Sequence, residues 1–355
     1  MNIPTDSAVT PIRVGLLAYG AIGHEHNLAV QATDGLVLTA VCDTNPERIA
    51  AALELAPQAQ TFSDATEMLD SGLLDLVVIS TPPNSHAEWA RAALSRGIHV
   101  VVEKPMALHA SEGDELMELA AEQNLTLIVY QNRRFDRDFV TMRRLINEGA
   151  IGTPFAFESF VGGYSRPCDY WHSMVDVSGG AIFDWGSHYL DQVLNLFPQP
   201  VDYVTGHNHK RHWHHVTNAD HAEVTLTFAD GVTASFIHSD LAAARKPKYY
   251  VLGTEGAIVA HWNLIAEPAV ADLPALVTVH SNTGEVVRVD LDETPDFTFH
   301  RELAQFLHSG TPMQVTTVAS RDVVAIMEAA ERSAANNGRP EVPTLRGREQ
   351  TSVTQ

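Results

Sequence analysis

The chain has 355 residues, of which 45% are hydrophobic and 19% charged, and its formal net charge is −21 at pH 7. This length suits two domains that each bury a core, and the acidic balance argues against nucleic-acid and anionic-membrane partners. Cys42 and Cys168, the two cysteines, are too few for a disulfide scaffold. Without a basic, apolar leader or an apolar run of about 18 residues, the protein is expected to be cytoplasmic, with no membrane span.

Short apolar runs alternate with helical patterns in the first third of the chain. The expected strands are IRVGLLAY, VLTAVCD, LDLVVIST, IHVVVEKP and LTLIVYQN, and the expected helices include PERIAAALEL, HAEWARAALSRG and SEGDELMELAAEQN. Strands that are apolar throughout, separated by amphipathic helices, predict a parallel sheet covered on both faces. Residues 10–131 are therefore expected to form a doubly wound α/β domain.

The pattern changes over residues 132–340. A helix is expected at RDFVTMRRLINEG and a strand with one wet face at PFAFESFVGG. Three later segments, AEVTLTFADGVTASFIHS, KYYVLGTEGAIVAHW and ALVTVHSNTGEVVRVDL, each carry a turn dipeptide in the middle. They predict an open, mainly antiparallel sheet in an α+β domain. Helices are expected at TFHRELAQFLHSG and ASRDVVAIMEAAERSAANNG, followed by a polar tail at 341–355.

The first expected strand runs into AYGAIG, a variant of the dinucleotide-binding turn G-x-G-x-x-G in which Ala18 replaces the first glycine. This replacement leads us to expect that the position does not need a positive φ angle. Asp43 ends the second strand, where an acid binds the ribose 2′-hydroxyl and repels a 2′-phosphate, which favours NAD over NADP. The alternative is a strand-to-helix turn without a nucleotide. The candidate cofactor residues here are Ala18, Gly20, Ala21, Ile22, Gly23 and Asp43.

Two further turns follow expected strands, at the edge where open α/β sheets bind ligands. They are STPPNSH and EKP, and their candidate cofactor residues are Thr81, Pro82, Asn84, His86, Glu103 and Lys104. Simpler roles remain open for three of them. Asn84 could be a helix N-cap without any contact to a cofactor. His86 could be a surface histidine, and Lys104 could be a solvated loop residue.

The segment GGAIFDWGSHYLD places Asp184 and His188 one helical turn apart, on the same helix face. A buried carboxylate and imidazole at this spacing suit acid–base chemistry, since histidine titrates near neutral pH. The alternative is a helix-surface pair that contributes a few tenths of a kcal/mol. The apolar neighbours Ile182, Phe183 and Trp185 leave little room for a fully solvated face.

The glycine-rich turn, TPPNSH, EKP, QNRRFD and the GG…D…H pattern, in this order, resemble the Gfo/Idh/MocA oxidoreductase family over about residues 12–335. The QNRRFD stretch is most similar to the inositol and sugar dehydrogenases. The resemblance implies a Rossmann domain and a second domain whose open sheet mediates a homodimer or homotetramer. It also implies that Lys104, Asp184 and His188 are catalytic and that NAD is the cofactor. In that case His188 accepts the hydroxyl proton and Lys104 stabilises the alkoxide.

Other side chains are candidates for the substrate and cofactor sites. Asn132 either contacts nicotinamide or caps a helix, and Arg133 either faces the crevice or forms an ion pair at a helix start. Aromatic residues of YSRPCDYWH suit the C–H surfaces of a sugar. The candidate substrate residues are Arg133, Tyr164, Tyr170, Trp171, His172, Asp184, His188 and Arg211.

The segment HNHKRHWHH, residues 207–215, concentrates basic groups in an acidic chain. Its pattern does not match a structural zinc site, so no metal is expected. A solvated basic loop is the main interpretation. The alternative is a lid in which Lys210, Arg211 and neighbouring histidines bind an anionic substituent of the substrate.

These features predict an NAD-dependent oxidoreductase that oxidises a ring secondary hydroxyl of a sugar, a sugar derivative or a cyclitol. A second hypothesis is an NAD-dependent glycosidase that cleaves a glycoside by transient C3 oxidation and elimination, with an anionic (for example sulfonated) sugar as a possible substrate. A third is a non-catalytic NAD-sensing protein, which the intact set of Lys104, Asp184 and His188 disfavours.

Overall fold

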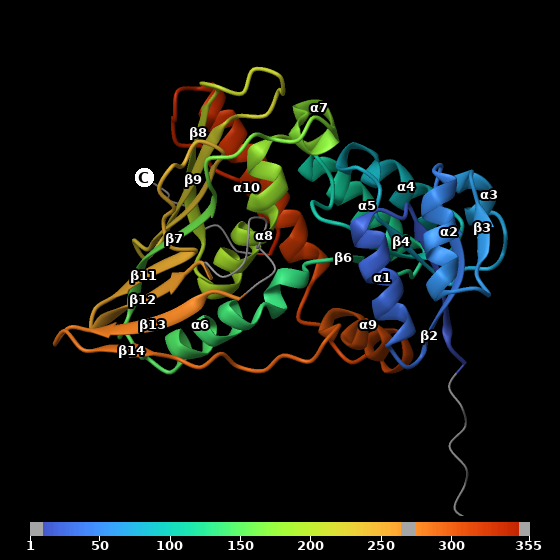
Figure 1. The fold of residues 1–355 in the computed structure, drawn as a ribbon, viewed down its shortest axis with the longest axis horizontal. Coiled ribbons are helices and arrows are strands. Elements are labelled where there is room, and N and C mark those ends of the chain that lie inside the picture. Colours follow the sequence, from blue (N-terminus) through green and yellow to red (C-terminus); the bar gives the residue numbers. More distant parts are fainter. Residues whose placement is uncertain (1–9, 264–273, 348–355) are drawn as a thin grey trace, which may run out of the picture.

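A computed structural model describes residues 10–263 and 274–347 of the chain. The first part of the chain forms one sheet and the later part forms another, and helices lie between the two (Figure 1). Among the helices of the described residues, none is long and apolar enough to cross a membrane.

The first sheet has six parallel strands in the order β3-β2-β1-β4-β5-β6. They are β1 (Ile12–Leu17), β2 (Leu36–Cys42), β3 (Gln60–Phe62), β4 (Leu76–Ile79), β5 (His99–Val102) and β6 (Leu127–Val129). Around them lie α1 (Ala21–Gln31), α2 (Pro46–Leu55), α3 (Ala65–Leu69), η1 (Pro83–Ser85), α4 (His86–Leu94) and α5 (Ala110–Glu122). All four residues of the central strand β4 are buried, as expected for a parallel sheet covered on both faces. The short elements β3 and α3 were not predicted.

The second sheet has eight strands in the order β14-β13-β12-β11-β7-β10-β9-β8. They are β7 (Pro154–Gly162), β8 (Val201–His209), β9 (His221–Phe228), β10 (Thr233–Ser239), β11 (Tyr249–Gly253), β12 (Gly256–His261), β13 (Leu276–Ser281) and β14 (Val286–Arg288). Every neighbouring pair is antiparallel except β7 and β10, which are parallel. The predicted fold class, a doubly wound parallel sheet followed by an open, mainly antiparallel one, is confirmed.

Helices cover one face of the second sheet, the face toward the first sheet (Figure 1). They are α6 (Arg137–Asn147), α8 (Ala181–Leu196) and α10 (Thr317–Ala335); the connections contain η2 (Asn132–Phe135), η3 (Trp171–Ser173) and α7 (Val175–Ser178). Strand β9 shows why one face is covered, since its side chains alternate strictly between buried and half-buried. On the opposite face of the described strands Figure 1 shows no helix.

The chain returns to the first sheet near its end. Helix α9 (Thr298–Ser309) lies beside α1 (Figure 1) and buries Phe299 and Leu303 in the same core as Val14 and Leu16 of β1. The predicted boundary at residues 131/132 assigns α9 to the second domain, and that boundary remains a prediction.

The segment expected to be a polar tail is partly packed. Glu341 and Val204 of β8 exchange backbone hydrogen bonds, and the amide of Gly347 donates to Asp322 of α10. Residues 348–355 of the predicted tail lie outside the described residues.

The expectation for Ala18 was wrong, because its φ angle is +73°. The Ala18 amide donates to the carbonyl of Cys42 at 2.8 Å. The Ala18 carbonyl oxygen packs against Gly23 so closely that a Cβ on Gly23 would lie only 2.7 Å from it. The tight connection from β1 to α1 therefore requires a left-handed residue here, and alanine adopts this conformation under strain.

Replacing Ala18 by glycine should relieve this strain. Left-handed backbone costs an L-residue about 1–2 kcal/mol, while the added freedom of the unfolded glycine removes about 0.4–1 kcal/mol, so Ala18→Gly should raise the free energy of unfolding slightly. The matched control, Ala50→Gly at an exposed position of α2, should lower it by about 1 kcal/mol. Denaturant unfolding of both variants measures the difference; a loss of stability in Ala18→Gly equal to that in the control would contradict the strain.

Candidate active site

A cavity of about 1300 Å³ is lined by both parts of the molecule. The first sheet contributes residues that follow β1, β2, β4 and β5, so the cavity lies at the carboxyl ends of parallel strands, where open α/β sheets bind ligands. The second part contributes residues from η3, α8 and the end of β10.

The glycine-rich turn opens one end of the cavity. Gly20, Ala21 and Ile22 line it at the first turn of α1, where backbone N–H groups attract anions. A Cβ on Gly20 would meet nothing within 4 Å, whereas one on Gly23 would clash with the Ala18 carbonyl. Gly23 therefore serves packing, Gly20 leaves room for a close ligand, and the turn fits a dinucleotide pyrophosphate.

Asp43 is buried at the same end and also organises the turn. Its Oδ2 accepts the Tyr19 amide at 2.7 Å and its Oδ1 accepts the Asn45 amide at 2.8 Å. An Arg48 Nη1 lies 3.5 Å from Oδ2. Each carboxylate oxygen has a second lone pair, so Asp43 can still accept a ribose hydroxyl.

The predicted residues after β4 separate into two groups. Thr81, Pro82 and His86 line the cavity, and Asn84 is exposed outside it. The buried His86 ring contacts the Thr81 carbonyl at 2.7 Å and the Pro105 carbonyl at 2.8 Å. His86 therefore connects the turn after β4 to the turn that carries Lys104.

Glu103 and Asn132 line the middle of the cavity. One carboxylate oxygen of Glu103 lies 2.9 Å from Nε2 of the buried His26, and the other accepts the Lys104 amide at 3.2 Å. The side-chain oxygen of Asn132 is buried without a hydrogen-bond partner in the described part of the chain. Such an acceptor in a cavity wall fits a ligand with a donor, such as a carboxamide.

Lys104 joins the two parts of the molecule. From the end of β5, its Nζ donates to the backbone carbonyl of Asp184 at 3.0 Å and to Oδ1 of the same residue at 3.2 Å. Nδ1 of His172 lies 3.7 Å from that oxygen. Burial alone would raise the pKa of the Asp184 carboxyl, but the Lys104 charge and His172 outweigh it and hold the pKa below its usual value.

His188 is buried one turn further along α8 and lines the same cavity. Its Nδ1 has no hydrogen-bond partner among the described residues. Burial, followed by the charges of Lys104 and Arg133, lowers the pKa of His188 well below its ordinary value. A neutral imidazole and the Lys104 ammonium therefore line the same cavity, which suits a base and a hydrogen-bond donor that act on one hydroxyl.

The start of α8 depends on two glycines. Gly179 and Gly180 have φ angles of +83° and +104°, and a Cβ on Gly179 would come within 2.7 Å of the Phe183 ring. The helix therefore begins at Ala181, which places Asp184 in its first turn, within reach of Lys104.

The structure brings together some of the predicted substrate residues. Tyr170, Trp171, His172 and Arg133 line the cavity. The rings of Trp171 and His172 stack at 3.6 Å. Arg133 lies 3.3 Å from Asp136 and over the Trp185 ring.

Tyr164 and Arg211 do not line the cavity. Tyr164 is exposed and its ring packs near Trp213, while the Arg211 guanidinium lies 3.2 Å from the His209 ring.

The histidine-rich segment is not a simple solvated loop. Residues 207–209 belong to β8, and the carboxylate of Asp220 holds the turn that follows. That carboxylate accepts Lys210 Nζ at 2.8 Å and the backbone amides of Arg211, His212 and Trp213. In the described residues, no group of three or more His, Cys, Asp or Glu side chains is placed to hold a metal ion.

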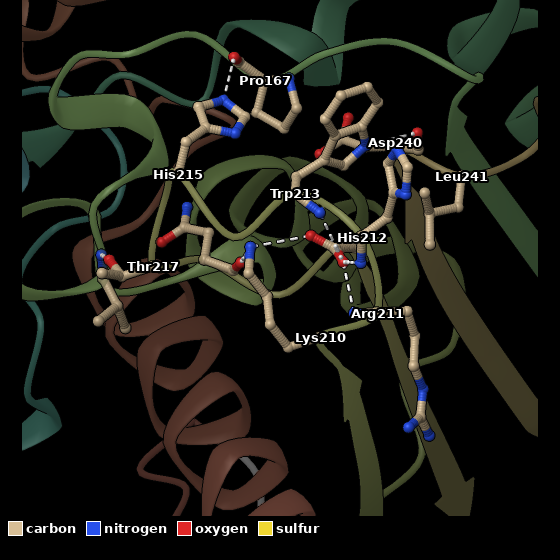
Figure 2. A network of polar contacts seen from close by, with 12 residues as sticks. Pro167, Lys210, Arg211, His212, Trp213, His215, Thr217, Asp240 and Leu241 are labelled. Carbon is tan, nitrogen blue, oxygen red and sulfur yellow. Dashed lines mark hydrogen bonds and ion pairs between the residues drawn. The ribbon is translucent and has the colours of Figure 1, made fainter.

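This turn supports the substrate wall. Lys210 Nζ also donates to the Asn218 carbonyl, and the Asn218 side chain donates to the carbonyl of His172 at 2.8 Å. The His215 ring lies 3.3 Å from the Pro167 carbonyl (Figure 2). Asp220 thus helps to position the cavity residue His172 through Lys210 and Asn218.

Sequence reasoning missed Asn218, His238 and Asp240, which all line the cavity. A signal was present for His238 and Asp240, because the apolar alternation of β10 ends in the polar run HSD at the carboxyl end of the strand. Asn218 carries no comparable pattern.

Removing the Asp220 carboxylate should destabilise the protein, because it leaves Lys210 and three backbone amides without their acceptor. We expect Asp220→Ala to lower the free energy of unfolding by about 3 kcal/mol. Asp202→Ala, which removes the same charge from an exposed position of β8, should change it by less than about 0.5 kcal/mol. Equal unfolding free energies for the two variants would show that the turn does not depend on Asp220.

Comparisons with known proteins agree with this geometry. Residues 12–131 match the family model of the oxidoreductases with an NAD-binding Rossmann fold, and residues 139–259 match that of the GFO/IDH/MocA C-terminal domain. The scyllo-inositol 2-dehydrogenase (NADP⁺) of Bacillus subtilis is 26% identical over 343 residues, which span 92% of this chain and 94% of the relative. The myo-inositol 2-dehydrogenase of Thermotoga maritima is 27% identical over 198 residues, 54% of this chain and 57% of the relative.

The crystal structure of an NAD-binding protein from Listeria innocua superposes with a TM-score of 0.82 at 25% identity, covering 97% of this chain and 99% of that one. The two family models together cover more than half of the chain, one on each side of the cavity. The chain therefore belongs to the Gfo/Idh/MocA family of oxidoreductases.

Proposed function

We propose that the protein is an NAD-dependent dehydrogenase that oxidises a secondary hydroxyl on the ring of a sugar, a sugar derivative or a cyclitol. The observation that carries the proposal is the contact of Lys104 with Asp184, with His188 in the same cavity wall. This set lies where the nucleotide half of the cavity meets the half formed by the second sheet. The names of the two inositol dehydrogenases support this substrate class.

The side chains have complementary roles in this reaction. Lys104 donates a hydrogen bond to the substrate hydroxyl and stabilises the negative charge that develops on its oxygen. The neutral His188 accepts the hydroxyl proton. Asp184 orients the Lys104 ammonium through their shared hydrogen bond. Bound NAD would supply the acceptor for the hydride.

The cofactor would be held by the turn at Gly20, by Asp43 and by Asn132. Asp43 supports NAD over NADP, because a buried carboxylate repels a 2′-phosphate. Arg48 could in principle attract a 2′-phosphate. Its Nη1, however, lies 3.5 Å from the Asp43 carboxylate, which offsets the positive charge of the guanidinium.

We also retain the prediction of a homodimer or homotetramer through the second sheet. Its support is the sheet face without helices in Figure 1 and the exposure of Tyr203 on β8 and Tyr250 on β11.

Removing either proton-handling group should slow the reaction. We expect Lys104→Met and His188→Gln to lower kcat/KM by about 10²- to 10⁴-fold, since each removes one donor or acceptor of the transition state. Both variants should bind NAD as the wild type does. Lys246→Met, which removes a lysine outside the cavity, is the control and should retain full activity; losses of less than about threefold in both active-site variants would exclude these roles.

The low pKa of His188 predicts the pH dependence. The neutral imidazole is the active form, so activity is lost only when pH falls through the folded-state pKa, which lies well below 6.5. The acidic limb of log kcat/KM should therefore lie below pH 6.5, and it should disappear from the residual activity of His188→Gln. An acidic limb above pH 6.5 that persists in this variant would assign it to another group.

The function is tested by incubating the protein and NAD with free sugars, cyclitols and nitrophenyl glycosides while recording NADH and nitrophenol together. Stoichiometric NADH from a free sugar or cyclitol is the expected result. Release of nitrophenol over many turnovers without net NADH would instead indicate a redox-assisted glycosidase.

A further inference from the structure

A second polar pair, His238 and Asp240, lines the cavity at the end of β10. Strand β10 runs parallel to β7 and carries both residues to the cavity that also holds Asp184 and His188. The His238 Nε2 lies 3.9 Å from Asp240 Oδ1, and its Nδ1 is buried without a partner in the described chain. The proposed reaction does not use either residue.

The backbone of Asp240 is fixed on both sides. Its amide donates to the Asp220 carbonyl at 2.8 Å, and its carbonyl accepts the Ser165 amide and the Trp213 indole N–H (Figure 2). The histidine-rich turn and the substrate wall therefore fix the backbone of this residue at the edge of the cavity.

The carboxylates of Asp220 and Asp240 differ in their partners. Asp220 accepts four hydrogen bonds, whereas the Asp240 carboxylate has only the 3.9 Å contact with His238 among the described residues. A partly buried carboxylate without a donor is an acceptor for a ligand's hydroxyl groups. Burial, together with the nearby charges of Asp220 and Asp184, raises the pKa of the Asp240 carboxyl, while His238 and the Lys210 charge oppose this shift.

The charge around the cavity is unbalanced. Six carboxylates and three cationic side chains are among the described residues that line it. Of the cations, Lys104 contacts Asp184, Arg133 contacts Asp136, and Arg48 lies at the nucleotide end. Among the described residues no Lys or Arg side chain contacts the Asp240 carboxylate, so an acidic substituent on a substrate ring would be repelled there.

The cations of the histidine-rich turn do not contact the Asp240 carboxylate among the described residues. Lys210 donates to Asp220, and Arg211 extends toward His209, away from Asp240 in Figure 2. The arrangement thus differs from a lid that binds an anion.

We propose that His238 and Asp240 bind a hydroxyl of the substrate ring other than the one that is oxidised, and that Asp240 selects uncharged polyols against ring acids. This inference rests on the proposed function for the identity of the reacting hydroxyl. One ring hydroxyl that donates to Asp240 and a second that accepts from Lys104 would hold the ring by two separate contacts.

Equilibrium binding tests the inference without requiring turnover. The NAD-loaded protein is titrated with myo-inositol, D-glucose and D-glucuronate, and the intrinsic tryptophan fluorescence is followed, since Trp171 and Trp185 line the cavity. Wild type should bind a neutral ring at least about 10-fold more tightly than D-glucuronate. Asp240→Asn and His238→Gln should each weaken binding of the neutral ring by about 10-fold, and Asp240→Asn should reduce the discrimination against D-glucuronate.

Asp176→Asn is the matched control, because it removes the same charge from an exposed residue of α7 outside the cavity. It should leave all three affinities unchanged. D-glucuronate binding as tightly as the neutral rings, or unchanged affinities in both Asp240→Asn and His238→Gln, would overturn the inference. If Asp240→Asn does not fold, the inference is tested by the affinity of His238→Gln for the neutral ring and by the preference of the wild type for neutral rings over D-glucuronate.

Binding affinities and NADH formation test the charge selection and the dehydrogenase function separately. The expected affinities without NADH formation from any polyol would overturn the dehydrogenase function and leave the charge selection intact. NADH formation from ring acids with the same kcat/KM as from neutral rings would overturn the charge selection and leave the function intact.

Discussion

The contact between Lys104 and Asp184 is the interaction on which the site depends, because its two partners come from different parts of the molecule. Lys104 follows β5 of the parallel sheet, and Asp184 lies in the first turn of α8, which packs on the second sheet. This contact holds the Lys104 ammonium of the nucleotide half of the cavity against the helix that carries His188. Burial, followed by the Lys104 charge, lowers the pKa of His188, while Asp184 opposes this shift.

Two features within the second part hold α8 in position. Arg134 donates to both oxygens of Asp191 at 2.6 Å, and both side chains are buried. Asp191 lies seven residues after Asp184 on the same helix, so this ion pair fixes the far end of the segment that carries the site. The glycines at 179 and 180 fix the near end, where a side chain on Gly179 would not fit.

The sequence predicted the features that depend on local pattern. Asp43 and Lys104 were found because each follows an apolar strand of the expected parallel sheet. Asp184 and His188 were found because their four-residue spacing puts them on one face of a helix. Contacts between distant segments could not be predicted in this way. The return of α9 to the first sheet, the pairing of Asp220 with the histidine-rich turn and the arrival of Asp240 in the cavity all depend on tertiary packing, which periodicity does not encode. The positive φ of Ala18 was missed because propensity disfavours it, and the tight turn overrides that preference.

In the proposed reaction the set formed by Lys104, Asp184 and His188 removes a proton from a ring hydroxyl while the ring carbon loses hydride. The most direct measurement is a single turnover of the NAD-loaded protein with a ring polyol deuterated at the oxidised carbon, followed by NMR of the recovered cofactor. We expect one deuterium at nicotinamide C4 for each molecule oxidised, with a much slower transfer in Lys104→Met. Oxidation without deuterium in the cofactor, or transfer at the wild-type rate in Lys104→Met, would contradict it.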